Sequence, residues 1–228
     1  MPKYHPAAVL FDMDGTLIDS EKLWDVALEE LAAHYGGRLS TAARRAMVGT
    51  SMAETLAILH ADIGQPWRDA AASAAWLERR VAELFATDLR WRPGARRLLG
   101  AVRRTGIPTA LVTSTARALV DVALDTLGRD NFDVVICGDE VSAPKPDPTP
   151  YLTAARRLGV PIRRCVAIED SPNGVTSAWT AGAVVLAVPS EVPLTPMPGV
   201  HLRGSLVDVD VEMLAALLDM ADVPAAQR

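Results

Sequence analysis

The sequence reads AAVLFDMDGT at residues 7–16, where an apolar run passes directly into two carboxylates, Asp12 and Asp14. The run is typical of a short buried strand, although apolar character alone also fits a buried helix. In a strand, alternate side chains lie on one side, so both carboxylates would face one pocket at its C-terminal end. Two acids this close favour a hard cation such as Mg²⁺ between them. The alternative at this point is a solvated Asp-Gly turn after an edge strand.

The composition fits a protein with a substantial core. Half of the 228 residues are apolar, which suits one large domain or one domain with an insert. A net charge of −5 offers no electrostatic footprint for nucleic acid or anionic membrane. Cys137 and Cys165 lie in apolar, strand-like runs, so we expect buried free thiols. With no signal segment before the first strand and no apolar run of membrane-spanning length, we expect a cytoplasmic protein without nucleic-acid or membrane partners.

From about residue 20 to residue 90 the pattern is helical throughout. Apolar residues such as Val26 and Ala27 recur at helical spacing, and Gly36 is expected to end the first helix. No stretch here alternates as a strand does. These residues therefore predict an all-helical insert, with residues 1–19 and 91–228 forming the surrounding domain.

Start signals divide the insert into further helices. Ser40 is a plausible N-cap of a second helix. Ser51 and Glu54 have the spacing of a capping box for a third. Pro66 fits the first turn of a fourth.

From residue 91 onward, strands alternate with helices. We expect strands at about 107–112, 132–137, 164–168 and 183–188, a short extended piece near Leu202, and a final helix at about 209–220. This alternation predicts βαβ units and a parallel sheet with helices on both faces. The predicted fold is thus α/β, a Rossmann-like, doubly wound sheet with a helical insert.

Polar residues follow the predicted strands. They are Asp12 and Asp14 after the first, Thr113 and Ser114 after the second, Lys145 in the loop after the third, and Glu169 and Asp170 after the fourth. The carboxyl ends of parallel strands share one sheet edge, where ligands bind in such folds. Each group also has an ordinary alternative: the hydroxyls as helix N-caps, the lysine as a solvated loop residue, and the later acids as a helix start.

Together these groups suit phosphoryl transfer. A carboxylate such as Asp12 can attack phosphorus when the substrate's charge is neutralised. A metal held by Asp12 and Asp170, together with Lys145 and the Thr113 hydroxyl, would neutralise and bind the phosphoryl oxygens. Asp14 would then be available to protonate the leaving alkoxide and later to take a proton from water.

Four segments resemble the four motifs of the haloacid dehalogenase (HAD) superfamily. They are DMDGTL at 12–17, VTS at 112–114, KP at 145–146 and IEDSPNG at 168–174. The resemblance implies a HAD fold in which Asp12 is the nucleophile, Asp14 the acid/base, and Thr113 and Lys145 the phosphoryl-binding residues. It also implies that residues 20–90 form a C1 cap domain. We further expect three residues of these motifs, Gly15, Thr16 and Ser114, to contact the substrate.

The same resemblance implies a Mg²⁺ cofactor. Its ligands would be Asp12, the backbone carbonyl of Asp14, and Asp170, with Glu169 binding directly or through water. The dehalogenases of the superfamily lack the second aspartate, so Asp14 argues for phosphoester chemistry.

Within the superfamily, the chain looks most like the branch of β-phosphoglucomutase and small sugar-phosphate phosphatases. The stretch at 48–56 resembles the substrate loop of that branch. Where the mutase has an arginine in this loop the chain has Met52, and where it has a histidine on the first cap helix the chain has Trp24. The expected substrate-lining residues of the cap are Glu21, Lys22, Trp24, Gly49, Thr50, Ser51 and Met52. His34 and His60 look structural.

Neither methionine nor tryptophan can hold a second phosphate by charge, so we favour hydrolysis. The predicted function is a monomeric, Mg²⁺-dependent phosphatase of a small, sugar-phosphate-like monoester, acting through an aspartyl phosphate. A phosphosugar mutase and a catalytically silent binding module remain alternatives.

Overall fold

A computed structural model describes residues 5–47, 50–190 and 192–221 of the 228. The chain divides into two compact units. The first comprises Met1–Asp19 and Arg90–Arg228, and the second comprises Ser20–Leu89. Each unit is described by itself.

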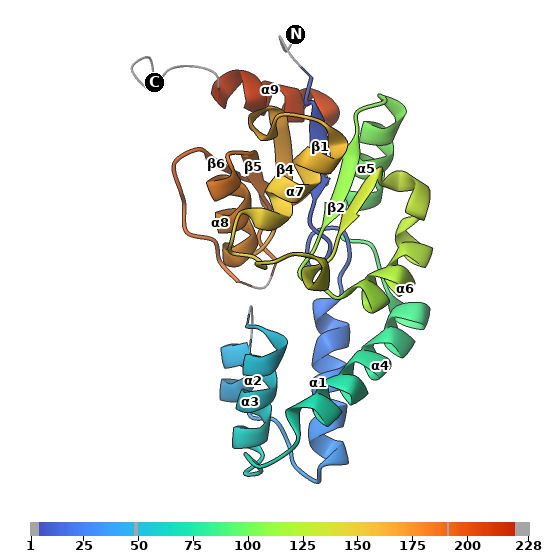
Figure 1. Cartoon of the computed structure of the whole chain (residues 1–228), viewed down its shortest axis with the longest axis vertical. Coiled ribbons are helices and arrows are strands. Elements are labelled where there is room, and N and C mark those ends of the chain that lie inside the picture. The colour runs from blue at the N-terminus through green and yellow to red at the C-terminus, as the bar shows by residue number, and fades with distance from the viewer. Residues whose placement is uncertain (1–4, 48–49, 191, 222–228) are drawn as a thin grey trace. The chain divides into compact units, whose positions relative to one another are not determined.

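The first unit is built on a six-stranded sheet in which all neighbouring strands are parallel (Figure 1). The strands are β1 (Ala8–Phe11), β2 (Thr109–Val112), β3 (Val134–Ile136), β4 (Cys165–Glu169), β5 (Val184–Ala187) and β6 (Val200–Leu202). Their order across the sheet is β3-β2-β1-β4-β5-β6, so the direction of winding reverses between β1 and β4. The predicted α/β, doubly wound, Rossmann-like fold is confirmed.

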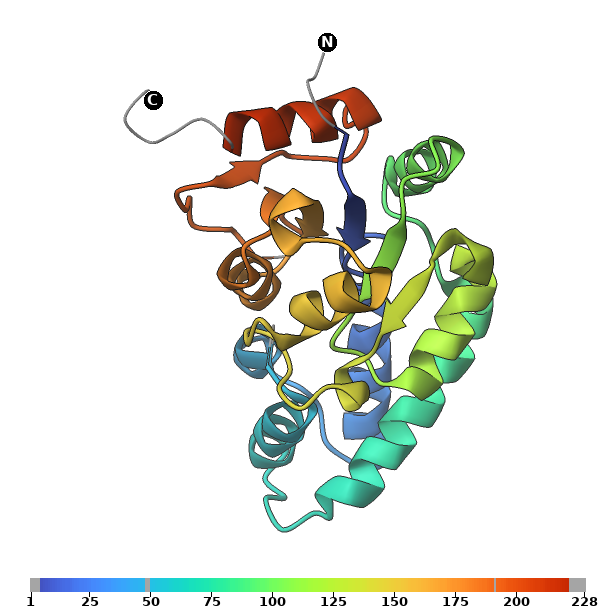
Figure 2. The same ribbon diagram turned by 45° about the horizontal axis from the view of Figure 1, so that its top comes forward.

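Helices connect and cover these strands (Figure 2). They are α5 (Ala95–Arg104), α6 (Arg117–Leu127), α7 (Thr149–Leu158), α8 (Pro172–Ala181) and α9 (Val211–Ala221), with three short 3₁₀ turns at Arg129–Asn131, Gly138–Glu140 and Ile162–Arg164. Helix α7 packs against β1, β2 and β3, and α8 packs against β4 and β5. Helix α9 also contacts β4 and β5 and meets α5.

The alternation of side chains along β1 and β4 determines which residues face α7 and α8. Ala8 and Leu10 of β1 and Ala167 of β4 belong to the apolar cluster formed with those two helices. The next residues on that side are Asp12 and Glu169. The strands run in register there, and the Asp12 amide donates to the Ile168 carbonyl at 3.0 Å. Two acids are thereby brought together at the end of a buried sheet.

The start of α8 fixes the chain just beyond Asp170. The Ser171 side chain accepts a hydrogen bond from the Gly174 amide at 3.1 Å, and Pro172 occupies the first turn. Gly182 ends the helix in the left-handed conformation. Both ends of α8 thus carry residues that are typical of a helix start and a helix stop.

The second unit consists of helices α1 (Glu21–His34), α2 (Thr41–Met47), α3 (Met52–Asp62) and α4 (Ala70–Asp88) over its described residues. Ser51 and Glu54 form the predicted capping box at the start of α3. The helical spacing of Val26 and Ala27 agrees with α1. Ala27 is buried, whereas Val26 is 41% exposed.

The predicted start of α4 is wrong. The helix begins at Ala70, not in the turn that contains Pro66. Asp69 is its N-cap, and the carboxylate accepts from the Ala71 amide at 2.8 Å and the Ala72 amide at 3.3 Å. An aspartate that satisfies two free amides is a stronger start signal than a proline that only tolerates the first turn.

The two places where the chain leaves and re-enters the sheet unit are hydrogen bonded to each other. Ile18 and Trp91 form an antiparallel bridge. The Asp19 amide donates to the Arg90 carbonyl at 2.9 Å, and the Arg92 amide donates to the Leu17 carbonyl at 2.8 Å.

Two further expectations concern cysteines and membranes. Cys137 and Cys165 are buried and free, as predicted. Among the described residues, no helix combines the length and apolar character needed to cross a membrane.

Candidate active site

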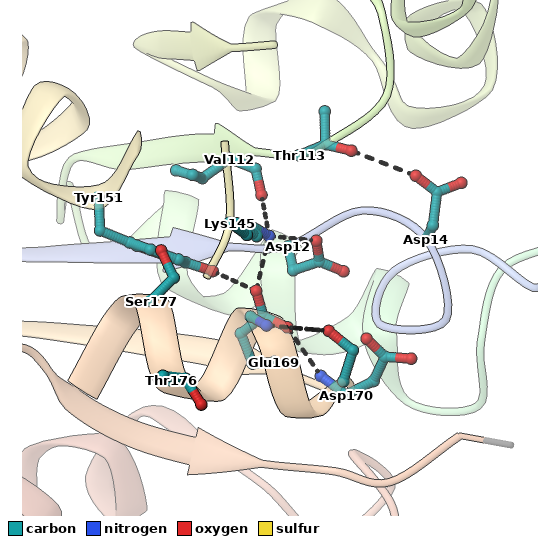
Figure 3. A network of polar contacts seen from close by, with 12 residues as sticks. Asp12, Asp14, Val112, Thr113, Lys145, Tyr151, Glu169, Asp170, Thr176 and Ser177 are labelled. Atoms are coloured by element: carbon teal, nitrogen blue, oxygen red, sulfur yellow. Dashed lines mark hydrogen bonds and ion pairs between the residues drawn. The ribbon is translucent and has the colours of Figure 1, made fainter. Parts of the chain in front are cut away.

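Asp12 lies at the end of β1 and is 6% exposed. Its Oδ1 accepts a hydrogen bond from Lys145 Nζ at 2.7 Å (Figure 3). Its Oδ2 is buried and has no hydrogen-bond partner within the described parts of the chain. Burial raises the pKa of Asp12 to about 8, with Glu169 and Asp14 adding to the rise and Lys145 opposing it. A buried carboxylate oxygen without a partner is costly unless a ligand satisfies it.

Lys145 is the cation of this site. Its side chain is 4% exposed, which rules out a solvated loop lysine. Nζ donates to Asp12 Oδ1, to Glu169 Oε1 at 2.6 Å and to the Val112 carbonyl at 2.9 Å. Burial alone lowers the pKa of Lys145, but the two adjacent carboxylates raise it by more. The ammonium therefore stays charged, with its three protons directed to three acceptors.

Glu169 is fully buried at the end of β4. Its Oε1 accepts from Lys145 and from the Tyr151 hydroxyl, both at 2.6 Å, and its Oε2 accepts from the Asp170 amide at 3.2 Å. A β-carbon on Gly174 of α8 would lie 2.0 Å from this carboxylate. Glu169 is thus part of a closed polar cluster, and the alternative of an exposed acidic helix start is excluded.

Three carboxylates converge tightly enough to hold a metal ion. Asp12, Glu169 and Asp170 each offer one oxygen, and these three atoms lie within 4.8 Å of one another. All three residues are buried, and the donors are oxygen only, the set that Mg²⁺ prefers. Asp12 Oδ2 has no partner in the described part of the chain, and together these observations show that the residues fit a hard divalent cation.

Both the backbone conformation and the surroundings of residue 15 require a glycine. Its φ of +75° lies in the left-handed region, and a β-carbon there would be 2.1 Å from Asp170 Oδ2. The neighbouring Thr16 hydroxyl is buried and has no partner among the described residues. The turn after β1 thus places the Gly15 backbone against the acidic cluster, and the Thr16 hydroxyl is a second buried polar group without a partner among the described residues.

Asp14 turns toward the end of β2 (Figure 3). Its Oδ2 accepts from Thr115 Oγ1 at 2.7 Å and from Thr113 Oγ1 at 3.2 Å. The Thr113 hydroxyl also accepts from the Thr115 amide at 3.0 Å. Both aspartates of the motif lie at the carboxyl edge of the sheet, but their contacts differ: Asp12 meets a cation and Asp14 meets two hydroxyls.

Neither predicted hydroxyl residue of this loop caps a helix. The N-cap of α6 is Ala116, which has no side-chain capping bond. Thr113 is buried and directed at Asp14, whereas Ser114 is exposed. A β-carbon on Gly138 would lie 2.1 Å from the Ser114 carbonyl, so the turn after β3 closely supports this loop.

The predicted substrate residues of the helical insert belong to the second unit. Thr50 Oγ1 donates to the Met47 carbonyl at 2.8 Å, and Ser51 caps α3. Trp24 and Met52 are half-buried, and Gly49 lies outside the described residues. Their role in substrate binding, with that of Glu21 and Lys22, stays a prediction.

Two residues of the site are not identified from the sequence. Thr115 follows the predicted motif by one position, and its hydroxyl could have been grouped with Thr113. Tyr151 sits on α7 and is fully buried, where an aromatic residue is normally core. Only its hydroxyl contact with Glu169 distinguishes it.

The sequence and the fold are similar to those of known proteins. The model of the haloacid dehalogenase-like hydrolase family matches residues 6–182. The phosphorylated carbohydrates phosphatase of Thermotoga maritima is 36% identical over 180 residues, covering 77% of this chain and 81% of that protein. Hexitol phosphatase A of Escherichia coli is 33% identical over 201 residues, covering 81% and 84%.

A solved structure extends the similarity to three dimensions. The crystal structure of CbbY from Rhodobacter sphaeroides in complex with phosphate matches with a TM-score of 0.80 and 30% identity. The match covers 89% of this chain and 96% of that one.

Proposed function

The chain belongs to the haloacid dehalogenase-like hydrolase family, and on that basis we propose that it is a Mg²⁺-dependent phosphatase of a small, sugar-phosphate-like monoester. Relatives that are named carbohydrate and hexitol phosphatases support the phosphatase activity and this substrate class. The observation that carries the proposal is the buried pair of Asp12 and Lys145, in which the second Asp12 oxygen has no partner among the residues that the structure describes.

The proposed reaction has two halves, with Asp12 as the nucleophile. In the first, a carboxylate oxygen of Asp12 forms a bond to phosphorus while the bond from phosphorus to the ester oxygen breaks. Asp14 gives a proton to the departing alkoxide. In the second, Asp14 takes a proton from a water molecule whose oxygen bonds to phosphorus, and the bond to Asp12 breaks to release phosphate.

The electrostatics of the site favour this order of reaction steps. Lys145 donates to Asp12 Oδ1, which orients the carboxylate and leaves Oδ2 available. Thr113 and Thr115 hold the Asp14 carboxylate at the neighbouring strand end. We assign phosphoryl contacts to Thr113, Lys145, Gly15, Thr16 and Ser114.

Asp12, Asp170, Glu169 and the Asp14 carbonyl are the proposed ligands of Mg²⁺. When bound, the ion would neutralise phosphoryl oxygens and so lower the cost of bringing an anionic substrate to Asp12. The three side chains would otherwise place excess negative charge against the phosphate.

We also propose that residues 20–90 act as a cap that selects the substrate and that the protein is a monomer. Met52 and Trp24 support hydrolysis over mutase chemistry, because neither side chain offers charge to a second phosphate.

The test is phosphate release from a panel of sugar, polyol, nucleotide and glycolytic phosphates, with and without Mg²⁺. We expect release with Mg²⁺, its loss on chelation by EDTA, and its abolition in Asp12→Asn. Asp12→Asn changes little in size, so an unchanged unfolding midpoint would separate lost chemistry from lost folding. Absence of release across the panel by the folded wild-type protein would contradict the proposal.

The alternatives give different products in the same assay. A mutase would isomerise a hexose 1-phosphate to the 6-phosphate when primed with bisphosphate. A binding module would bind phosphate esters without turnover, and Asp14→Ala would then have no activity to remove.

A further inference from the structure

Tyr151 joins the acidic cluster from a position that the proposed chemistry does not use. It lies on α7, is fully buried, and its hydroxyl donates to Glu169 Oε1 at 2.6 Å (Figure 3). Lys145 Nζ lies 5.2 Å from the centre of the Tyr151 ring, so the ring also borders the ammonium. A phenylalanine would fill the same apolar space in the core, and the hydroxyl is the part that packing does not explain.

The Glu169 carboxylate is enclosed on three sides. Lys145 and Tyr151 both donate to Oε1. Gly174 of α8 approaches so closely that a β-carbon would lie 2.0 Å from Cδ and from both carboxylate oxygens. The Asp170 amide donates to Oε2 at 3.2 Å, and the Ser171 hydroxyl is 3.4 Å from the same oxygen.

The two oxygens of this carboxylate have different partners. Oε1 accepts two short bonds from charged or phenolic donors, whereas Oε2 has longer bonds on the side of Asp170. Lys145 alone cannot fix the carboxylate, because its three protons are shared with Asp12 and Val112. The Tyr151 hydroxyl supplies a second donor to Oε1 from helix α7, and such second contacts to a metal ligand help to orient it.

We propose that Tyr151 is a positioning residue that orients Glu169 and thereby sets the affinity of the metal site formed by Asp12, Glu169 and Asp170. The inference rests on the proposed function, since it concerns the same metal site. Hydrogen bonds to metal ligands typically change metal affinity by about 10- to 100-fold when removed.

The experiment compares Tyr151→Phe with wild-type protein and with Tyr35→Phe. Tyr35 provides a matched control, because its hydroxyl bonds to Ser73 Oγ at 2.8 Å in the helical unit and is absent from the acidic cluster. Mn²⁺ serves as the probe, with binding followed by electron paramagnetic resonance of the free ion and without substrate. We expect about 10-fold weaker binding in Tyr151→Phe and wild-type binding in Tyr35→Phe.

A kinetic readout separates positioning from a general loss of structure. At saturating Mg²⁺ the KM for a phosphate ester is expected to stay within about twofold of wild type, while the Mg²⁺ concentration for half-maximal rate rises by about 10-fold. A Mn²⁺ affinity of Tyr151→Phe within twofold of wild type would overturn the inference.

If Tyr151→Phe is recovered unfolded, a second pair tests the same point. Removing both partners of a buried bond costs less than removing one. Glu169→Leu removes the acceptor, so Tyr151→Phe combined with Glu169→Leu should bind Mn²⁺ no more weakly than Glu169→Leu alone, and a further 10-fold loss in the double variant would contradict the inference. Failure of wild-type protein to bind Mn²⁺ would reject the proposed metal site as well, which distinguishes that outcome from failure of the Tyr151 role alone.

Discussion

Gly15 is the residue at which backbone conformation and the acidic cluster impose the same requirement. Its φ of +75° and the 2.1 Å separation between an added β-carbon and Asp170 Oδ2 both exclude a side chain. Gly15→Ala is therefore expected to displace Asp170 and to abolish most metal binding. It should also lower the free energy of unfolding by roughly 1 to 2 kcal/mol through the left-handed conformation alone. Denaturant unfolding and Mn²⁺ titration measure the two effects.

Gly106→Ala provides the control for this change. Gly106 has the same φ of +75°, but a β-carbon there would meet no atom of the described residues within 4 Å. It should show the conformational cost without the loss of metal affinity. Equal metal binding in the two variants would contradict the assignment of Gly15 to the site.

For single residues, the sequence is sufficient to predict membership of the site where residue type and order along the chain are distinctive. Asp12, Lys145, Glu169 and Asp170 are predicted from their places after the expected strands, and the structure brings their side chains together. The specific partners are not predictable. Tyr151 looks like any buried aromatic residue until the fold brings it to Glu169.

The same limit applies to Asp14. Its carboxylate meets the hydroxyl of Thr115, 101 positions away in the chain. Such a contact depends on how β1 and β2 pair, and no local pattern encodes it.

Helix α8 contains a position, Gly174, at which we expect the usual preference of helices for alanine over glycine to be reversed. Gly174→Ala would ordinarily favour a helix by up to about 1 kcal/mol. Here the added carbon would lie 2.0 Å from the Glu169 carboxylate, so we expect a loss of stability and of metal affinity instead. Thermal unfolding with and without Mg²⁺ measures both.

Gly100→Ala in α5 is the matched substitution. The nearest atom to its added carbon is the flexible end of Arg104, at 3.4 Å. It should stabilise the protein by roughly 0.5 to 1 kcal/mol. A stabilised Gly174→Ala with wild-type metal affinity would show that the close approach to Glu169 is unimportant.

The helical unit contains a buried histidine with a predictable response to pH. His60 Nε2 lies 2.9 Å from Ser73 Oγ. Burial lowers the pKa of His60, and Arg68 lowers it further. An unfolded histidine titrates near ~6.5, so below that pH the unfolded chain binds more protons than the folded unit. The contribution of neutral His60 to the free energy of unfolding is thus fully present above about pH 6.5 and is lost as the pH falls below that value.

We expect the denaturant midpoint of the helical unit, measured by tryptophan fluorescence, to decrease as the pH is lowered from 7.5 to 5.5. In His60→Gln the decrease should be smaller, because the titrating group is gone. An identical decrease in both proteins would assign the pH dependence to other groups.

The elements themselves are mostly predictable where start and stop signals agree with apolar periodicity, as at Ser171 and Gly182 of α8. The exception at α4 has a physical cause. The segment before it is held by contacts to Tyr35: Gln65 Nε2 donates to the Tyr35 carbonyl at 2.9 Å, and Arg68 stacks on the Tyr35 ring. Contacts to a distant residue thus delay the helix past Pro66.

For the whole molecule, metal binding is expected to stabilise one unit only. The proposed ligands all lie in the sheet unit, at the ends of β1 and β4. Mg²⁺ at 100 times its Kd would add about 2.7 kcal/mol to the unfolding free energy of that unit. Hydrogen exchange should show added protection in peptides of β1 and β4 and little change in α1, α3 and α4. Uniform protection across both units would indicate that they unfold together.

The strand order has a consequence for how the protein is made. β1 is central in the sheet, yet its neighbours β2 and β4 lie far along the chain, with β4 ending at Glu169. At a synthesis rate of about 5 to 20 residues per second, β1 leaves the ribosome roughly 8 to 30 seconds before its second partner. Both edges of this apolar strand stay open until β2 emerges, and one edge stays open until β4 emerges, which makes it the kind of segment that recruits chaperones. The helical unit ends at Leu89, before β2 begins, so its whole sequence emerges while β1 still lacks both neighbours, and it can fold first.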